Sequence, residues 1–193
     1  MRPSFLRIVG ATIQTMLILS LHGCIENRIQ KIAITMEGRE IILPDNLELM
    51  NSDHISDTTW LDTDNKIRLV INIPKESCSG CRLSAKSLLD SILYILPSCE
   101  FSPVVILSEP EDTEIANIEA AIATARPSYP VYIDNDGQFL KSNRFIPRDI
   151  QLLQAFLIDT SGNIILIGDP SFDYNIMKVY QKALNGMVTG HEP

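Results

Sequence analysis

Apolar residues along the chain alternate between short continuous runs and runs with a three-to-four-residue spacing. The short runs are bounded by turn-forming residues, as is typical of buried strands. Before the last third of the chain they occur at residues 67–73, 104–107 and 130–133. The wider spacing predicts a helix that follows Cys81 and a second helix that starts near Asp112. Residues 138–154 carry neither pattern clearly and are predicted to be irregular or weakly helical.

The last third of the chain predicts a hairpin followed by a helix. Residues 155–159 and 164–167 are apolar and flank Thr160-Ser161-Gly162-Asn163, a turn-forming stretch. A final helix follows, with Asp173 as its N-cap. Alternating strands and helices predict an α/β protein whose central sheet has helices on both faces. The terminal hairpin and helix narrow this prediction to a thioredoxin-like three-layer sandwich.

The residues before the first strand of the domain predict a short β extension. Residues 29–42 have the pattern of two short strands around Glu37-Gly38, and residues 44–60 have the polarity of a loop. We therefore expect three parts along the chain. They are a signal peptide over residues 1–23, an N-terminal extension with a β-hairpin over residues 24–60, and a thioredoxin-like domain over residues 61–188.

The first residues resemble a bacterial lipoprotein signal. Arg2 and Arg7 supply a positive start, and the mostly apolar stretch 8–21 is shorter than the about 20 residues that cross a bilayer. Leu21-His22-Gly23-Cys24 resembles the lipobox, which implies that Cys24 is lipidated and that the protein is anchored in the bacterial cell envelope, facing the periplasm or the surface. An ordinary secretory signal and an uncleaved anchor helix remain alternatives.

Composition and charge exclude several classes of protein. With 45% hydrophobic and 21% charged residues, the chain has the composition of a globular protein rather than of a disordered one. The formal charge is −8, from 16 basic and 24 acidic residues, and the sequence has no cluster of Lys and Arg. Nucleic-acid binding relies on neutralising phosphates, so we expect no nucleic-acid partner.

Two cysteines stand where the first strand of the domain meets its first helix. In Cys78-Ser79-Gly80-Cys81, the leading sulfur is predicted to lie at the helix N-terminus, where unpaired N–H groups favour a thiolate. The two-residue spacer keeps the second sulfur near enough to resolve a mixed disulfide. Cys78 is therefore the predicted attacking thiol and Cys81 the resolving thiol. Arg82 and Lys86 could add positive potential, which Glu76 would oppose.

A structural disulfide is the alternative interpretation of this pair. A zinc site would need two further ligands, and Cys99, His54 and His191 do not stand at ligand spacing. We expect no metal and no cofactor, and we expect Cys99 to be a buried free thiol.

Several segments resemble TlpA-like, thioredoxin-fold lipoproteins and periplasmic thiol–disulfide proteins. The resemblance rests on the strand–Cys-x-x-Cys–helix unit and on the segment from Phe156 to Ile165. Further segments resemble poorly characterised lipoproteins of Bacteroidetes type, namely residues 129–134, 143–147 and 167–170. The resemblance covers about residues 60–185. It implies thiol–disulfide exchange with protein thiols and disulfides of the envelope, with electrons from an upstream donor that the sequence does not identify.

The chain departs from this family at two places. Ser77 precedes Cys78 where the family usually has tryptophan, and the dipeptide between the cysteines lacks the usual proline. Leu153 stands at the position where thioredoxin folds place a cis-proline that pairs with substrate. A cis bond before a residue other than proline costs about 2.5–4 kcal/mol, so we expect a trans bond before Leu153. This departure puts substrate docking by the usual route in doubt.

Two other interpretations are disfavoured. A peroxiredoxin site built on Cys81 would need a hydroxyl residue where Cys78 stands, and Arg126 and Arg144 are predicted to be solvated surface charges. Asp134-Asn135-Asp136-Gly137 resembles the start of a calcium loop but is followed by Phe145 where the glutamate ligand belongs, so we expect a turn.

The sequence therefore favours a membrane-anchored thiol–disulfide oxidoreductase of the cell envelope. Its rival is a non-catalytic thioredoxin-fold binding module in which a Cys78–Cys81 disulfide is structural.

Overall fold

The computed structural model describes residues 27–50, 67–75, 77, 79–84, 101–127 and 129–189. The chain divides into two compact units, Met1–Met36 and Glu37–Pro193. The predicted boundaries at residues 23/24 and 60/61 fall outside the described residues, so these domain limits stay predictions.

The described part of the first unit is a helix, which corrects the predicted hairpin. Residues 27–36 are helical, and Glu37 and Gly38 form the turn that ends the helix. The apolar residues Ile29, Ile32, Ala33 and Met36 are three or four positions apart, which is the spacing of a helix face and not of a strand. Gly38 has a φ of 73°, a conformation that glycine adopts without a steric penalty. The hairpin prediction was wrong because the turn signal outweighed this helical spacing.

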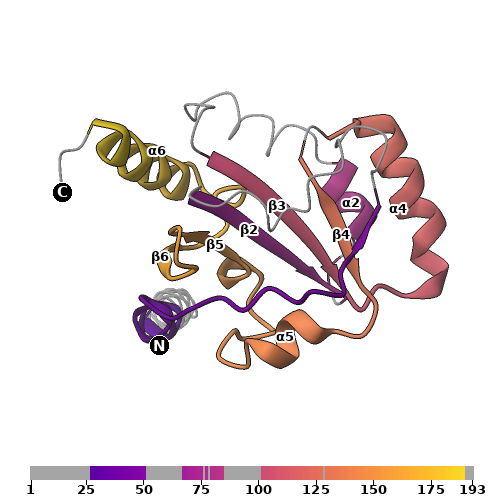
Figure 1. Cartoon of the computed structure of the whole chain (residues 1–193), viewed down its shortest axis with the longest axis horizontal. Helices are drawn as coiled ribbons and strands as arrows, with labels where there is room; N and C mark the ends of the chain where they lie inside the picture. Colours follow the sequence, from indigo (N-terminus) through magenta and orange to yellow (C-terminus); the bar gives the residue numbers. More distant parts are fainter. Residues whose placement is uncertain are drawn as a thin grey trace, which may run out of the picture. The chain divides into compact units, whose positions relative to one another are not determined.

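Six strands form one mixed sheet in the second unit (Figure 1). Their order is β1-β4-β3-β2-β5-β6. They are β1 (Glu48–Leu49), β2 (Ile67–Pro74), β3 (Phe101–Ser108), β4 (Val131–Asp134), β5 (Ala155–Ile158) and β6 (Ile164–Ile167). The strands β2, β3 and β4 run parallel, whereas β1, β5 and β6 are antiparallel to their neighbours. All the strands that the sequence predicts from residue 67 onward are confirmed.

The helices follow the strands in the predicted order. They are α2 (Ser79–Ser84), α4 (Asp112–Ala125), α5 (Gln138–Ser142), the 3-10 helix η3 (Gln151–Leu153) and α6 (Tyr174–Thr189). The predicted helix after Cys81 begins as α2, and its continuation beyond residue 84 lies outside the described residues. Asp173 is the N-cap of α6, because its Oδ1 accepts a hydrogen bond of 2.7 Å from the N–H of Asn175.

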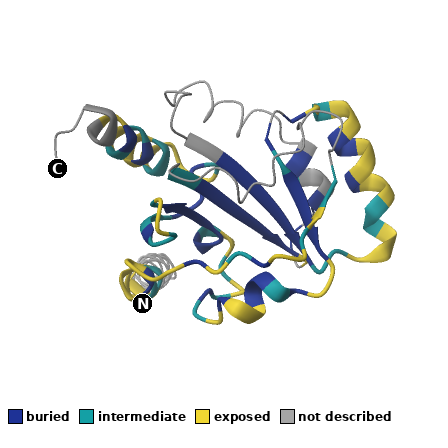
Figure 2. Ribbon diagram, viewed as in Figure 1, coloured by how far each residue is buried: buried dark blue, intermediate teal, exposed yellow. Residues whose placement is uncertain are grey.

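Both faces of the sheet are buried (Figure 2). Alternate residues of a strand point to opposite faces. On one face, residues such as Ile71 and Val105 join a core cluster with Leu83 of α2, Ile118 of α4 and Tyr180 of α6. On the opposite face, the strands carry buried apolar residues that lie outside that cluster, namely Val70, Val104, Ile106 and Phe156. The helix α5 packs against β3 and has two buried apolar side chains of its own, Phe139 and Leu140.

Residues 37–50 run along the sheet as an extended strap. The N–H of Ile41 donates to the carbonyl of Gly162 at 2.9 Å, and β1 at the other end of the strap pairs with β4. Between these two ends of the strap, the backbone of Ile42 is bonded to the buried Asn143 side chain. The N–H of Ile42 donates to Asn143 Oδ1 at 2.9 Å, and Asn143 Nδ2 donates to the carbonyl of Ile42 at 2.7 Å. The short β extension thus contributes the edge strand β1 of the sheet.

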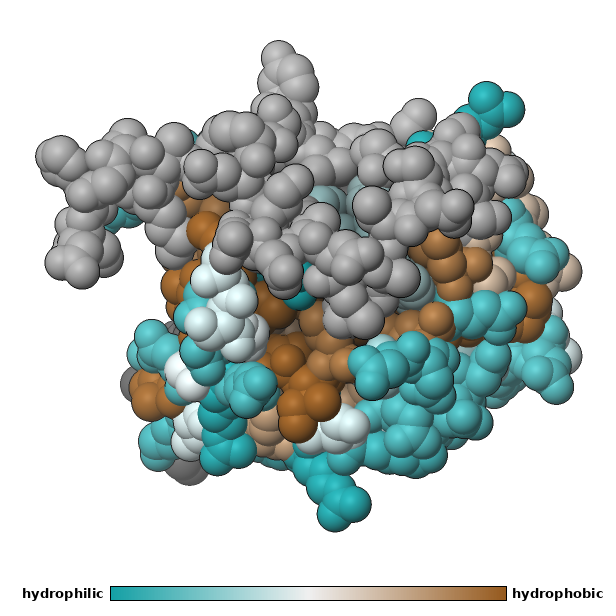
Figure 3. Space-filling model, in the orientation of Figure 1, coloured by the Kyte–Doolittle hydropathy of each residue, from teal (hydrophilic) through white to brown (hydrophobic). Residues whose placement is uncertain are grey.

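The surface of the described residues is mixed. Figure 3 shows hydrophilic residues over the lower right of this face, with hydrophobic residues toward its centre. Within the described ranges, no helix combines the length and the apolar character needed to cross a membrane.

Candidate functional site

The cysteine motif lies at the junction between the central strand β2 and α2. Pro74 ends β2, and α2 begins at Ser79 and contains the backbone of Cys81. This confirms the predicted strand-to-helix context of the motif. Cys78 itself lies outside the described residues, as do Cys24, Cys99 and both histidines that were weighed as ligands.

Ser77, directly before the motif, and Ser79, inside it, are both buried. The N–H of Ser77 donates to the carbonyl of Pro74 at 2.8 Å, which closes a turn directly after β2. The Oγ of Ser77 accepts a hydrogen bond of 2.9 Å from Nε2 of Gln151. The Oγ of Ser79, between the two cysteines, is buried without a hydrogen-bond partner. The residue that replaces the usual tryptophan is therefore tethered to η3.

The backbone around Leu153 is hydrogen-bonded within the chain. No cis peptide bond occurs among the described residues, so the bond before Leu153 is trans, as predicted. The N–H of Leu153 donates to the carbonyl of Ile150 at 3.0 Å. The carbonyl of Leu152 accepts a hydrogen bond of 2.9 Å from the N–H of Asp169. These two backbone groups are already satisfied within the chain, so they are not available to pair with an extended peptide.

A neutral polar chain runs beneath the end of β2. Ser108 Oγ donates to Asn72 Oδ1 at 2.6 Å, and Asn72 Nδ2 donates to Gln154 Oε1 at 2.7 Å. Gln154 Nε2 in turn donates to the carbonyl of Pro147. All three side chains are buried. No sequence pattern predicted this chain as a whole, although Asn72, a polar residue inside an apolar strand, indicates a buried polar partner.

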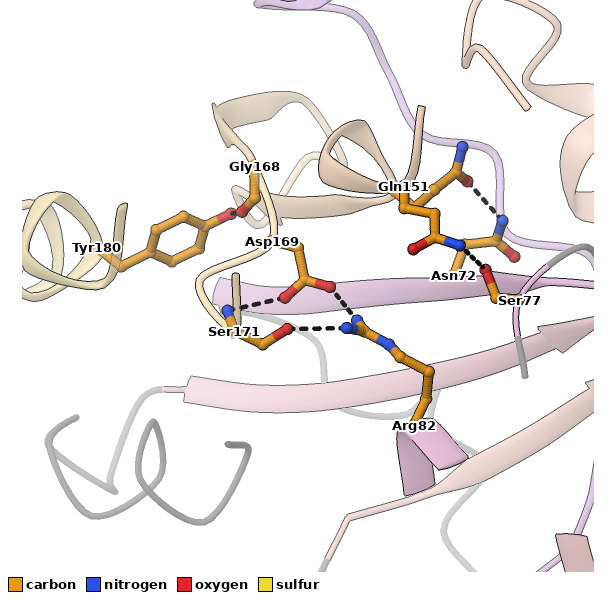
Figure 4. Close-up of polar contacts among 9 residues, drawn as sticks. Asn72, Ser77, Arg82, Gln151, Gly168, Asp169, Ser171 and Tyr180 are labelled. Carbon is orange, nitrogen blue, oxygen red and sulfur yellow. Dashed lines mark hydrogen bonds and ion pairs between the residues drawn. The ribbon is translucent and has the colours of Figure 1, made fainter. Parts of the chain in front are cut away.

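A charged cluster lies on the other side of the motif. The guanidinium of Arg82 forms an ion pair with the buried Asp169, and its Nη1 donates to Ser171 Oγ at 3.1 Å (Figure 4). The same guanidinium lies over the ring of Phe172, 4.6 Å from its centroid. Arg82 was predicted to add positive potential, but its charge is paired with that of Asp169. No sequence pattern predicted Asp169 as the partner of Arg82.

Tyr180 of α6 completes this region. Its hydroxyl donates to the carbonyl of Gly168 at 2.9 Å, directly beside Asp169 in sequence. Burial raises the pKa of the Tyr180 hydroxyl well above its usual value, and the charge of Asp169 raises it further. The hydroxyl therefore stays protonated and donates this hydrogen bond at any ordinary pH.

The remaining predicted polar residues have structural positions. Arg126 is exposed at the C-cap of α4, and Arg144 is exposed with its Nε donating to the carbonyl of Lys141, which confirms that both are surface charges. The carboxylate of Asp134 accepts hydrogen bonds from the N–H groups of Gln138 and Phe139, at 2.9 and 2.8 Å. This confirms a turn, closed by the start of α5. The described ranges contain no cluster of three His, Cys, Asp or Glu residues that could hold a metal ion.

No family model and no curated protein matches the sequence. Solved structures do match. The thioredoxin domain of a thiol-disulfide oxidoreductase from Bacteroides vulgatus is 18% identical, with a TM-score of 0.52, and the match covers 77% of this chain and 98% of that chain. A protein assigned as the thiol:disulfide interchange protein DsbE of Chlorobium tepidum is 17% identical, with a TM-score of 0.52 and coverages of 77% and 96%.

A third match is the solution structure of a thioredoxin-like protein in its oxidised form. It is 13% identical, with a TM-score of 0.52, and the match covers 84% of this chain and 99% of that chain. At these identities the matches establish the architecture and not the chemistry. The mixed sheet with helices on both faces, with Cys81 in the helix that follows its central strand, is therefore a thioredoxin-like fold with a short N-terminal β extension.

Proposed function

We propose that this protein is a thiol–disulfide oxidoreductase that uses Cys78 and Cys81. The observation that carries the proposal is the place of the motif in the fold, between the end of β2 at Pro74 and the start of α2 at Ser79. The solved structures of similar architecture include proteins described as a thiol-disulfide oxidoreductase and as a thiol:disulfide interchange protein, which supports the same chemistry.

The exchange consists of two thiolate attacks. The Cys78 thiolate attacks one sulfur of a substrate disulfide, a Cys78–substrate disulfide forms, and the other substrate sulfur leaves as a thiolate that takes up a proton. The Cys81 thiol gives up its proton and attacks the Cys78 sulfur, so that the first substrate sulfur also leaves. The substrate is reduced by two electrons and the pair is oxidised to the Cys78–Cys81 disulfide. A dithiol donor then reduces the pair again, and the reverse sequence oxidises a substrate dithiol.

We further propose that the protein works in the bacterial cell envelope. Leu21-His22-Gly23-Cys24 supports lipid attachment at Cys24, and several acyl chains would make a stable anchor. The substrates are then protein thiols and disulfides outside the cytoplasm, where disulfides persist.

A non-catalytic binding module with a structural disulfide is the second candidate. The observation that favours it is the segment opposite the motif, where the carbonyl of Leu152 and the N–H of Leu153 are both bonded within the chain. The extended substrate pairing that the family makes at this position is therefore not available, although exchange with a substrate held elsewhere on the surface remains compatible with it.

A trapping experiment separates the two candidates. The full-length chain in mild detergent, with Cys99→Ser as the background, is reduced and mixed with a peptide disulfide. Cys81→Ser removes the resolving thiol, so we expect a persistent mixed disulfide at Cys78, detected by mass. Cys78→Ser is the matched control and should form at least tenfold less adduct. Equal adduct on both variants, or none on either, would remove the catalytic proposal and leave the binding module.

A further inference from the structure

The residue that follows the cysteine motif is held by three contacts to one loop. Arg82 forms an ion pair with Asp169, donates to Ser171 and lies over the ring of Phe172, and all three partners belong to the loop between β6 and α6. The Arg82 side chain is 23% exposed and the Asp169 side chain 1% exposed. The guanidinium therefore extends from α2 to a buried carboxylate, and Figure 4 shows the contact between them.

Asp169 is also bonded to the rest of its surroundings. Its Oδ1 accepts a hydrogen bond of 2.9 Å from the N–H of Ser171, and its own N–H donates to the carbonyl of Leu152 in η3. The neighbouring Gly168 accepts the Tyr180 hydroxyl from α6. Two adjacent loop positions, Gly168 and Asp169, thus connect three elements, namely α2, η3 and α6.

The buried Asp169 carboxylate is paired with a cation. A carboxylate that is removed from water needs a cationic partner, and among the described residues Arg82 is the cation bonded to Asp169. Ser171 is neutral, and the hydroxyl of Tyr180, whose pKa burial raises, stays protonated. On the N-terminal side of the motif in the sequence, the described residue Lys75 is charged and exposed. The positive charge that follows Cys81 in the sequence is therefore paired with a negative charge from the loop after the edge strand β6.

We propose that Asp169 is a positioning residue of the cysteine pair, which holds α2 through Arg82 and cancels the charge that Arg82 would otherwise add to the helix of the motif. The inference rests on the proposed function. An adjacent cation stabilises a thiolate, and with it the reduced form of the pair. Pairing with Asp169 removes this effect, so the loop between β6 and α6 sets how strongly the pair is held in its reduced form.

Two substitutions of opposite sign distinguish this role from a merely structural one. Asp169→Asn keeps the shape and leaves the charge of Arg82 uncompensated. We expect the pH profile of Cys78 alkylation to move to lower pH, and the dithiol-to-disulfide ratio in a glutathione buffer to rise at least threefold. Arg82→Gln leaves a buried negative charge and should move both quantities the other way. The double variant Asp169→Asn/Arg82→Gln should return both to within twofold of the wild type, because neither charge remains.

Two control variants make the same changes in net charge at exposed positions. Lys182→Gln on α6 removes a positive charge, as Arg82→Gln does, and Glu119→Gln on α4 removes a negative charge, as Asp169→Asn does. Neither control should shift either measurement. Arg82→Lys keeps the charge and should stay within twofold of the wild type. If Arg82→Gln does not fold, the pair Asp169→Asn and double variant still decides the question.

Shifts in the same direction for Asp169→Asn and Arg82→Gln, or no shift in either, would overturn the inference and leave a structural clamp. Failure of the proposed function has a different signature, because the wild-type thiols would then reach no reversible equilibrium with glutathione. The alkylation profile needs only the free thiol, so it tests the role of Asp169 in either case.

Discussion

Two buried polar regions flank the cysteine motif, and they are built from different chemistry. On one side, Arg82 and Asp169 form an ion pair that ties α2 to the loop after β6. On the other, Ser108, Asn72 and Gln154 form a chain of neutral hydrogen bonds that ties β2 to β3 and to the segment after η3. Both regions fix the backbone around the motif, but only the first carries charge.

The difference predicts which region can influence the thiols at a distance. A neutral hydrogen-bond chain fixes geometry and adds no net charge, so its loss should appear mainly as lost stability. An ion pair also sets the electrostatic potential around it, so its loss should appear both in stability and in the behaviour of the cysteines. Substitutions in the two regions should therefore separate the stability of the fold from the redox properties of the pair.

The largest effect is expected from Arg82→Ala. This change leaves the Asp169 carboxylate buried without a counter-ion, and we expect a loss of about 3 kcal/mol in the free energy of unfolding, at the lower end for buried pairs because Arg82 is partly exposed. Urea unfolding measures it. Arg144→Ala, at an exposed arginine, is the control and should cost less than 0.5 kcal/mol or so.

Gln154→Leu tests the neutral region. The side chain keeps its approximate size, but Asn72 Nδ2 and the carbonyl of Pro147 lose their buried partner. We expect a loss of about 2 kcal/mol in the free energy of unfolding. The dithiol-to-disulfide ratio in a glutathione buffer should change less than twofold. A shift as large as that of Asp169→Asn would show that the neutral chain also acts on the thiols, and the comparison between the regions would fail.

Tyr180→Phe removes one hydrogen bond at the edge of the charged region. The carbonyl of Gly168 loses its donor, and we expect a loss of about 1 kcal/mol at pH 8. Burial raises the pKa of Tyr180 in the folded protein, so the stability that the hydroxyl contributes is complete below the pKa of the unfolded chain, about 10, and declines as the pH rises above it. Urea unfolding at pH 8 and pH 10.5 or so should show the wild type losing its advantage over the variant. Tyr174→Phe, at an exposed tyrosine, should show no such difference.

The smallest effect is expected from Gln151→Ala. Gln151 is exposed, and its hydrogen bond to Ser77 competes with water, so the free energy of unfolding should fall by only about 0.5 kcal/mol. Because Ser77 directly precedes Cys78, the rate of Cys78 alkylation should rise if η3 restricts access to the motif. An unchanged rate together with unchanged stability would show that this tether does not restrict the thiol.

The sequence predicted the framework well because the framework depends on local patterns. The apolar runs of β2, β3 and β4 and the hairpin of β5 and β6 are visible in residue spacing alone, and so is the cap at Asp173. The helix at residues 27–36 was missed because Glu37-Gly38 is a genuine turn signal, which ends a helix as readily as it joins two strands.

The contacts around the motif could not be predicted because they join residues far apart in the chain. Arg82 and Asp169 are 87 residues apart, and Asn72 and Gln154 are 82 apart. Spacing rules reach only a few residues along a helix or strand, and a single sequence gives no signal that pairs such positions. Polar residues within apolar stretches, such as Asn72, show that a buried partner is needed but not which residue it is.

The reduction potential of the Cys78–Cys81 pair decides between thiol–disulfide exchange and a structural disulfide. The full-length chain in mild detergent is equilibrated with thiol redox buffers, and the alkylated cysteines are counted by mass. We expect a reversible potential between about −120 and −270 mV, the range of known exchange proteins. A potential below about −300 mV, or a pair that never forms a disulfide, would contradict it and leave a thioredoxin-fold binding module.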